Sequence, residues 1–420
     1  MVGIGGRRDG IHARQPFRSF PEAFNNTEIF VIDVNVKKIW SAPLSQLPAS
    51  IAEQLQSTNM NHFQDHDTLY ITGGYAYSET EDDHISFPYL TSVRVSSLIN
   101  AIVNANAISP HFKQVTNEIF AVTGGEMGKI GDEFYLVGGH RFDGRYNPMG
   151  HGTFIQTYTN QVRKFRINNS GNELFISGYS TITDAVHLRR RDYNLIPWIL
   201  PDGSEGYTIS SGVFQLNEDL PYLYPVDIHE GGYTPITTFN QYLSNYHCAH
   251  ASLYDSSTKS MHTLFFGGIS QYFYRDGQLT EDRKVPFVKT ISRLTRFPDG
   301  SFKEYLVPTE MPALQGAGAE FFPLYPNTSE ITRLGTTIAD TIFIGHIYGG
   351  INSMYTHAFT NINTQSTTAD NVIYEVRLIR KPNAQGLPVE GRNPFAIEIF
   401  PNPAHSFVKL RYQLESDTQV

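Results

Sequence analysis

Arginine, histidine and tyrosine gather in the segments that directly follow short apolar runs ended by glycine. These residue types bind acidic groups, donate hydrogen bonds and dominate recognition surfaces. Binding residues also favour loops that a rigid scaffold holds in place. Together with two arginines of a later triplet, the predicted ligand-binding residues are Arg7, Arg8, His12, Tyr75, Tyr77, His140, Arg141, Arg145, Arg189, Arg191, Tyr272, Tyr274, Arg275 and His357. The same loops also carry Arg14, His84, Asp143, His151 and Tyr355. The alternative is that these loops are solvated and only stack on one another.

The densest charge cluster is Arg189-Arg190-Arg191-Asp192. On an inner strand, Arg189 and Arg191 would share one face and the other two residues the opposite face. A guanidinium fork suits an anionic ligand such as a carboxylate. The competing interpretation is a structural ion pair.

Metal and catalytic motifs are not found in the sequence. In His247-Cys248-Ala249-His250, alternation along a strand leaves at most two ligands on one side, fewer than a metal site needs. Cys248 is therefore expected to be a small buried core residue. The acidic stretch 79–83 lacks the spacing of a calcium loop. No nucleophile elbow, phosphate loop or zinc-protease motif occurs, so we assign no catalytic residue, metal or cofactor.

The elements that must position these residues follow one pattern: a polar turn, an apolar and aromatic run, and a glycine pair. A short apolar run between turn residues predicts a strand, and the glycines mark a backbone that needs unusual freedom. The copies are 67–74, 130–139, 261–268 and a looser 341–350, with a shortened copy at 2–6 and a degenerate copy at 207–212. They are spaced roughly 55–80 residues apart, more than the about 40–50 residues of an ordinary propeller blade, so the loops must be long.

This apolar run with its glycine pair resembles the repeat of kelch-type β-propellers, although the tryptophan that often closes that repeat is mostly absent. The resemblance implies an all-β fold, a six-bladed kelch-like β-propeller over residues 1–381 with a short C-terminal β segment, and partners bound on one loop face. The clearest unit is predicted to place its strands at 119–123, 130–139, 161–167 and 173–177. The first blade is expected to lack its inner strand and the last blade its outer strand, as if an upstream segment supplied both.

Composition agrees with an all-β class. Aromatic residues make up 13 % of the 420 residues and charged residues only 17 %. The net charge of −9, without a basic stripe, argues against nucleic-acid binding. A single cysteine rules out an internal disulfide framework, and no apolar run reaches the length of a membrane span. No signal peptide begins at Met1.

The C-terminal segment begins with a linker rich in Pro, Gly and Asn at 382–394. Phe400-Pro401-Asn402-Pro403-Ala404 and an alternating run at 407–412 follow. This combination resembles the start of the C-terminal sorting domain of Bacteroidetes type IX secretion substrates, here residues 395–420. The resemblance implies a secreted or cell-surface protein, the type IX secretion machinery as a partner, and a signal peptide upstream of Met1. The alternative is a simple turn between two strands.

Taken together, the sequence favours an exported binding module over an enzyme. It would recognise a glycan, a peptide or a surface protein through its long-loop face. The alternative is a secreted carbohydrate-active hydrolase, lyase or epimerase with Arg and His at the channel mouth. Convergence of Arg189 or Arg191 with His140 and His250 within hydrogen-bond reach would support the enzyme. An intracellular scaffold is a third possibility, against which the sorting-like tail argues.

Overall fold

The structure is a computed structural model that describes residues 1–14, 16–150, 152–200, 202–324, 330–334, 341–358, 366–380, 395–401 and 418–419. Strands account for 52 % of the chain and helices for 8 %, so the predicted all-β class is confirmed. The longest described helix, α2, has nine residues. Among the described residues, no helix combines the length and the hydropathy that crossing a membrane would require.

The fold is a β-propeller with five blades, so the prediction of six blades is wrong. Five sheets contain a path of four antiparallel strands. The N-terminal sheet has only three strands, β1 (Val2–Gly3), β2 (Glu28–Asp33) and β3 (Lys38–Pro43). The glycine-ended copy at 2–6 therefore starts a sheet that is one strand short of a blade.

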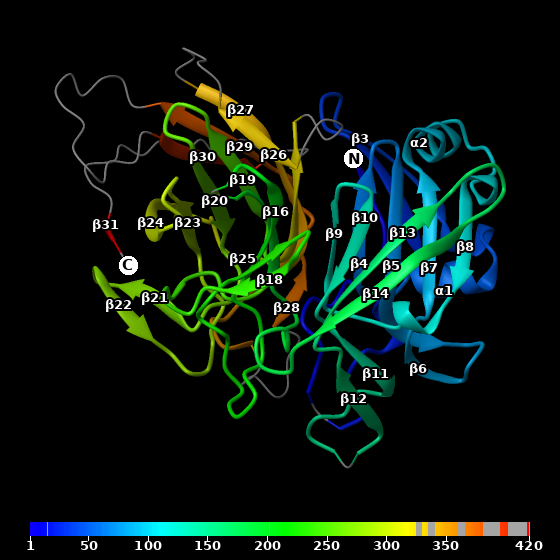
Figure 1. The fold of residues 1–420 in the computed structure, drawn as a ribbon. Coiled ribbons are helices and arrows are strands. Elements are labelled where there is room, and N and C mark those ends of the chain that lie inside the picture. Colours follow the sequence, from blue (N-terminus) through cyan, green and yellow to red (C-terminus); the bar gives the residue numbers. More distant parts are fainter. Residues whose placement is uncertain are drawn as a thin grey trace. The chain divides into compact units, whose positions relative to one another are not determined.

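The chain divides into two compact units (Figure 1). The first unit comprises Met1–Asp192 and Phe214–Asn217, and the second comprises Tyr193–Val213 and Glu218–Val420. Each unit is described by itself below.

The first unit contains the three-stranded sheet and two larger sheets. One has the order β4 (Thr58–Asp65), β5 (Thr68–Ser78), β7 (Tyr89–Arg94), β8 (Phe112–Thr116). Its long strand β5 also pairs with an extension formed by β6 (Asp83–Ser86), β11 (His140–Gly144) and β12 (Phe154–Tyr158). The other has the order β9 (Glu126–Ile130), β10 (Glu133–Val137), β13 (Gln161–Asn168), β14 (Phe175–Thr183). The strand expected at 119–123 is not formed, because a 3₁₀ turn, Glu118–Phe120, leads instead into β9.

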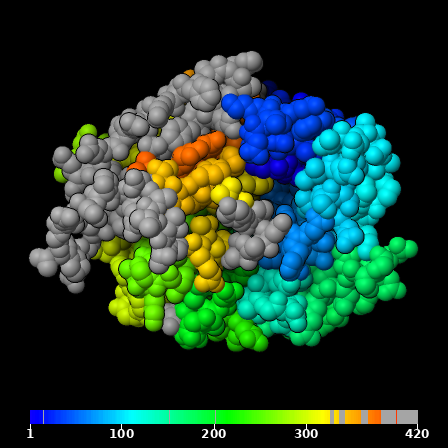
Figure 2. Space-filling view, turned by 90° about the horizontal axis from the view of Figure 1, so that it is seen from above, coloured from blue at the N-terminus to red at the C-terminus, as the bar shows by residue number. Residues whose placement is uncertain are grey.

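Two helices cover apolar surface in this unit. Helix α1 (Ala49–Leu55) packs on β5, and α2 (Val95–Val103) packs on β2 and β3. Leu98 and Ile102 of α2 are buried with Ile29 and Val31 of β2. Figure 2 shows the blue N-terminal residues beside the cyan residues of the α2 region. Three further 3₁₀ turns lie at Glu22–Phe24, Leu44–Gln46 and Ser109–His111.

The second unit contains three sheets with four-stranded paths. The first has the order β15 (Asn194–Ile199), β16 (Glu205–Ser210), β17 (Val226–His229), β18 (Gly232–Pro235). The second has the order β19 (His250–Asp255), β20 (Ser260–Phe266), β23 (Thr290–Arg296), β24 (Phe302–Glu310), with β26 (Ile331–Leu334) and β31 (Thr418–Gln419) at its edges. A separate hairpin joins β21 (Tyr272–Arg275) and β22 (Gln278–Glu281).

The last sheet has the order β25 (Leu314–Pro323), β27 (Thr341–Ser353), β29 (Tyr374–Arg380), β30 (Phe395–Pro401), with β28 (Thr367–Ala369) beside β27. The outer strand of the last blade was predicted to be missing, but β30 fills that position by pairing with β29. Its residues were predicted to belong to the sorting domain. Ile397 of β30 belongs to the buried core of this sheet. The expected linker 382–394 and residues 402–417 lie outside the described residues, so the sorting domain stays a prediction.

The glycine pairs at 138–139 and 267–268 follow the ends of β10 and β20, but those at 73–74 and 349–350 lie inside β5 and β27, so the prediction that each pair ends a strand is wrong there. Close approach of another chain segment explains the glycines. Gly73 and Gly267 each have a left-handed φ of +66°. A Cβ at Gly73 would lie 1.8 Å from the carbonyl oxygen of Val122, and one at Gly267 would lie 2.2 Å from that of Gln315. Only glycine combines this backbone conformation with so close a chain–chain approach.

Candidate recognition surface

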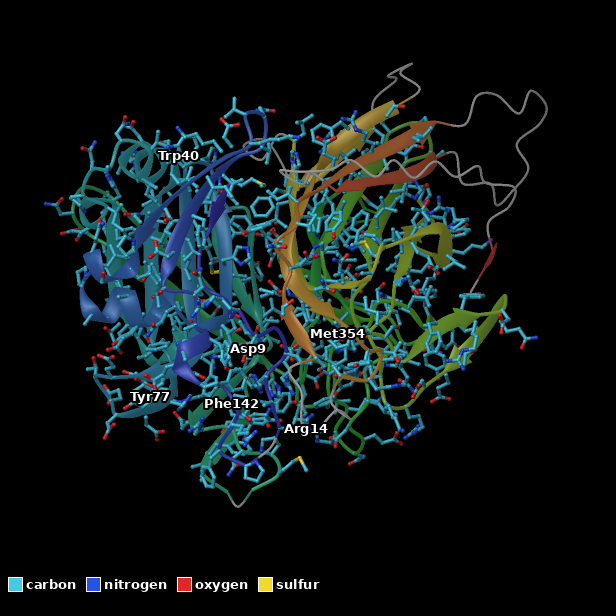
Figure 3. The ribbon with its side chains drawn as sticks, turned by 180° about the vertical axis from the view of Figure 1, so that it is seen from behind. Asp9, Arg14, Trp40, Tyr77, Phe142 and Met354 are labelled. Carbon is cyan, nitrogen blue, oxygen red and sulfur yellow. The ribbon has the colours of Figure 1, made fainter. Side chains whose placement is uncertain are left out.

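Three predicted loop segments and the segment of the arginine triplet meet at one end of the first unit. We call the described residues of 5–25, 75–87, 139–160 and 187–192 the loop end. Figure 3 shows Asp9, Arg14, Tyr77 and Phe142 at this end of the unit and Trp40 at the opposite end. The segments that follow the glycine pairs at 5–6, 73–74 and 138–139 therefore lie together within this unit.

Arg7 is part of the framework of the loop end. Its side chain is 5 % exposed and makes two hydrogen bonds to the Asp9 carboxylate, at 3.0 and 2.8 Å. The same guanidinium donates to the Asn25 side chain at 2.9 Å and to the Pro21 carbonyl at 3.2 Å, and it lies 5.3 Å from the Phe20 ring. These bonds use the donors of Arg7 inside the protein, so its role is to fold the segment 5–25.

Tyr75 is also structural. Its buried hydroxyl donates to the Gly144 carbonyl at 2.8 Å and accepts from the Tyr146 backbone N–H at 2.9 Å. Burial raises the pKa of Tyr75, so the hydroxyl stays protonated. His84 donates from Nε2 to the Phe20 carbonyl at 3.1 Å, because a carbonyl oxygen can only accept. These bonds fasten the segments 5–25 and 139–160 to β5 and β6.

A continuous layer of rings covers this framework. The ring centroids of His12 and Tyr146 lie 5.0 Å apart, and those of Tyr146 and Phe142 lie 5.3 Å apart. His140 continues the layer, at 4.5 Å from Phe142 and 5.7 Å from Tyr158. The edge-on and tilted geometries are the ones that aromatic pairs prefer.

The arginine triplet departs from the predicted inner strand, because residues 187–191 form a turn and an irregular segment. Arg190 is fully buried and donates from Nε to the His187 carbonyl at 3.0 Å. Arg189 and Arg191 both contact Tyr158, one at its ring and the other at its hydroxyl. The Arg189 guanidinium lies 3.8 Å from the Tyr158 ring centroid, and Arg191 Nε donates to the Tyr158 hydroxyl at 3.1 Å.

Arg191 is the cation around which the ring layer is arranged. Its guanidinium lies 4.9 Å from the Phe214 ring centroid and pairs with the neighbouring Asp192 carboxylate. Its charge acts on both nearby histidines. The pKa of His12 is lowered to about 4, chiefly by burial and to a smaller extent by the charge of Arg191. Burial lowers the pKa of His140 well below the usual value, and Arg191 again adds to the effect. Both imidazoles are therefore neutral near pH 7.

Hydrogen bonds fix which nitrogen of each neutral imidazole carries its proton. Nδ1 of His12 faces the Ala13 carbonyl at 3.1 Å, so it donates and leaves Nε2 as an acceptor. Nδ1 of His140 faces the Gln156 amide nitrogen at 2.7 Å, so it accepts and leaves Nε2–H as a donor. The layer thus offers a cation, a neutral donor and a neutral acceptor close together.

The remaining predicted residues of this unit lie around the layer in local contacts. Tyr77 donates to Asp82 at 2.6 Å, and this bond chiefly raises the pKa of Tyr77 to about 12. Arg141 pairs with Asp143 at 2.9 Å and with Glu118 at 2.6 Å. The other two contacts run from Arg8 to the Ala23 carbonyl at 2.6 Å and from Arg145 to the Ser19 carbonyl at 3.2 Å.

The other four predicted residues belong to the second unit. Tyr272, Tyr274 and Arg275 form one strand of the β21–β22 hairpin, and His357 Nε2 lies 2.9 Å from the Asp282 carboxylate.

Cys248 and His250 are also in the second unit. Cys248 is fully buried, as predicted, and burial raises the pKa of its thiol to about 12. His250 Nδ1 donates to the Cys248 carbonyl at 3.3 Å, and burial lowers the pKa of His250 to about 4. Among the described residues, no group of three or more His, Cys, Asp and Glu side chains could hold a metal ion.

Five aromatic residues of the layer were not among the predicted binding residues: Phe20, Phe142, Tyr146, Tyr158 and Phe214. A signal was present, because aromatic residues stand at 142, 146, 154 and 158 within one loop segment. Such a density of rings in a segment rich in glycine and polar residues predicts packing of the loop on itself.

Proteins similar to this chain are found among solved structures. No family model matches the chain, and no curated protein matches it. Among solved structures, the one described as "Structure of YjhT" is 9 % identical, with a TM-score of 0.48, and the match covers 94 % of this chain and 97 % of that chain.

Proposed function

We propose that the protein is a binding module that recognises a glycan, a peptide or a surface protein through the loop end of its first unit. The observation that carries the proposal is the position of Arg191. Its charge lies near His12 of the segment 5–25 and near His140 and Tyr146 of the segment 139–160, three polar rings from two loop segments. Convergence of several loops on one cation is the arrangement expected of a recognition surface.

The chemistry of the layer favours ligands that carry an acidic group. Arg191 supplies a permanent positive charge for an anionic oxygen, and the neighbouring His140, which is buried, adds no competing charge because it stays neutral. Ring faces such as those of Tyr146 and His12 pack against the apolar faces of a sugar or a side chain. A carboxylate on a glycan or on an acidic peptide meets both requirements.

The bonds found at Arg191 and His140 support binding rather than catalysis. Arg191 Nε is engaged by Tyr158, and His140 Nδ1 by Gln156. Neither bond joins a nucleophile to a general base, which is the contact that nucleophilic catalysis needs.

The experiment is a paired array of glycans and acidic peptides, with Arg191→Ala and Tyr146→Phe compared with the parent protein. We expect at least a ten-fold loss of affinity for Arg191→Ala. A smaller loss is expected for Tyr146→Phe, which keeps the ring and removes only the hydroxyl. Arg94→Ala is the matched control, because Arg94 is an exposed arginine of the same unit outside the loop end.

Unfolding curves of the same variants separate a lost contact from a lost fold. The proposal is contradicted if the parent protein binds nothing on either array. It is also contradicted if Arg191→Ala binds like the parent protein, or if Arg94→Ala loses as much affinity as Arg191→Ala.

We also propose that the protein is exported by the type IX secretion machinery to the cell surface or the medium. The support is the segment Phe400-Pro401-Asn402-Pro403-Ala404 and the alternating run after it. The test follows the full-length gene product in cell and medium fractions, with and without residues 402–420. We expect the shortened protein to stay inside the cell; undiminished export would contradict the proposal.

A further inference from the structure

Strand β14 is an outer strand with an open edge. Seven of its nine residues are exposed, and Phe175 and Tyr179 are 45 % and 44 % exposed. Figure 1 shows β14 beside β13, which is the one described element that packs extensively against it. Over the strand, the described residues provide no backbone partner for the second edge. An open edge presents unpaired N–H and C=O groups to any extended chain that approaches.

The absence of charge distinguishes β14 from comparable strands. Natural proteins protect sheet edges with lysine or proline, which oppose pairing with another strand. Phe175–Thr183 contains neither, and it contains no charged residue at all. Edge strands of three other sheets each carry at least one: Lys38 and Pro43 in β3, Lys113 in β8, and Pro235 in β18.

One feature of β14 still opposes pairing with another strand: a β-bulge. Its position determines which part of the edge can pair. The pairing with β13 shifts register between Lys164 and Arg166, where Gly178 has a left-handed φ of +64°. This bulge bends the strand and separates Phe175–Ser177 from Tyr179–Thr183. The second run is the longer straight edge.

We propose that the run Tyr179–Thr183 pairs antiparallel with the same run of a second copy of this chain, about a two-fold axis. In this register Thr181 lies opposite Thr181 of the second copy. Tyr179 lies opposite Thr183, and Ser180 lies opposite Ile182. Threonine pairs and aromatic–β-branched pairs are among the cross-strand combinations that stabilise sheets.

The self-complementary sequence is the reason to choose a second copy as the occupant. A two-fold axis places the residue on the axis opposite its own equivalent, so a charge at that position would meet a like charge. Thr181 is uncharged, and so are the residues on either side of it.

The test is the molar mass of the protein in solution across a range of concentrations, measured by sedimentation equilibrium. We expect the parent protein to form dimers. Thr181→Lys and Thr181→Glu should each weaken dimerisation at least ten-fold, because each places like charges opposite each other. An equimolar mixture of the two variants should restore the dimer, since lysine then faces glutamate.

Ser41→Lys is the matched control. It adds the same charge at an exposed position of β3, an edge that already carries Lys38, and it should leave the dimer unchanged. Rescue by mixing shows that the Thr181 variants are folded. The proposal is overturned if the parent protein is monomeric up to its solubility limit. It is also overturned if Thr181→Lys dimerises like the parent protein, or if the mixture stays monomeric.

Discussion

Replacing Arg7 by Met should destabilise the first unit, whereas the same change at the neighbouring Arg8 should have little effect. The side chains of Arg7 and Asp9 are 5 % and 10 % exposed, and two hydrogen bonds join them. Methionine fills much of the volume of arginine but provides no donor. The Asp9 carboxylate would then be buried without its cation.

The magnitude follows from the burial of this pair. An exposed ion pair contributes about 0–1 kcal/mol, whereas removing one partner of a buried pair costs about 3–5 kcal/mol. Because both side chains of this pair are at least nine-tenths buried, we expect a loss of about 3 kcal/mol. For a unit of roughly 200 residues this corresponds to a fall in Tm of about 6–12 °C.

The assay is urea unfolding of Arg7→Met, Arg8→Met and the double variant Arg7→Met/Asp9→Leu. Arg8 is exposed and makes one bond to a backbone carbonyl, so its loss should cost less than about 0.5 kcal/mol. The double variant should be more stable than Arg7→Met alone, because it removes the unpaired charge. A cost for Arg7→Met below about 1 kcal/mol, or one equal to that of Arg8→Met, would refute the assignment of Arg7 to the framework.

Two further predictions concern the glycine pairs and a buried carboxyl. Gly73→Ala should lower the free energy of unfolding by more than about 3 kcal/mol, because the new Cβ would lie 1.8 Å from the Val122 carbonyl oxygen. Gly6 has a φ of +82° but open space around it, so Gly6→Ala should lower it by only about 1–2 kcal/mol. Both values are measured by urea unfolding. Burial raises the pKa of Glu304 to about 8, above its usual value of 4.5, so the folded state holds this proton longer than the unfolded state. Stability should therefore fall as pH rises from about 4.5 to about 8, and Glu304→Gln should flatten that part of a plot of Tm against pH. A variant profile parallel to that of the parent protein would contradict this.

Local pattern was sufficient to predict the strands and their turns. The runs at 67–74, 130–139 and 261–268 overlap β5, β10 and β20, because alternation and turn residues act within a few positions of the chain. The unusual backbone of the glycine pairs was also predicted, although the pairs at 73–74 and 349–350 do not end their strands.

Predictions that depend on distant partners failed. The strand expected at 119–123 became a 3₁₀ turn, although its apolar residues Phe120 and Val122 are buried as a strand would bury them. The outer strand of the last sheet comes from beyond residue 394, and only its pairing with β29 reveals the assignment. The arginine triplet was predicted to be a strand because alternation can be seen in the sequence. The contacts that make this segment a turn involve distant residues, and the sequence does not show them.

For the same reason, the sequence alone could not show which candidate arginine is structural and which is placed to bind a ligand. Arg7 and Arg191 both lie against aromatic rings and both pair with a carboxylate close in sequence. Arg7 also has Asn25 and Pro21 as acceptors, so it joins parts of one segment, 5–25. Arg191 lies where three loop segments meet, and its charge affects polar rings from two of them. A guanidinium recognises a ligand only if the fold directs it toward the place where a ligand arrives, and that direction is set by contacts across more than a hundred residues of chain.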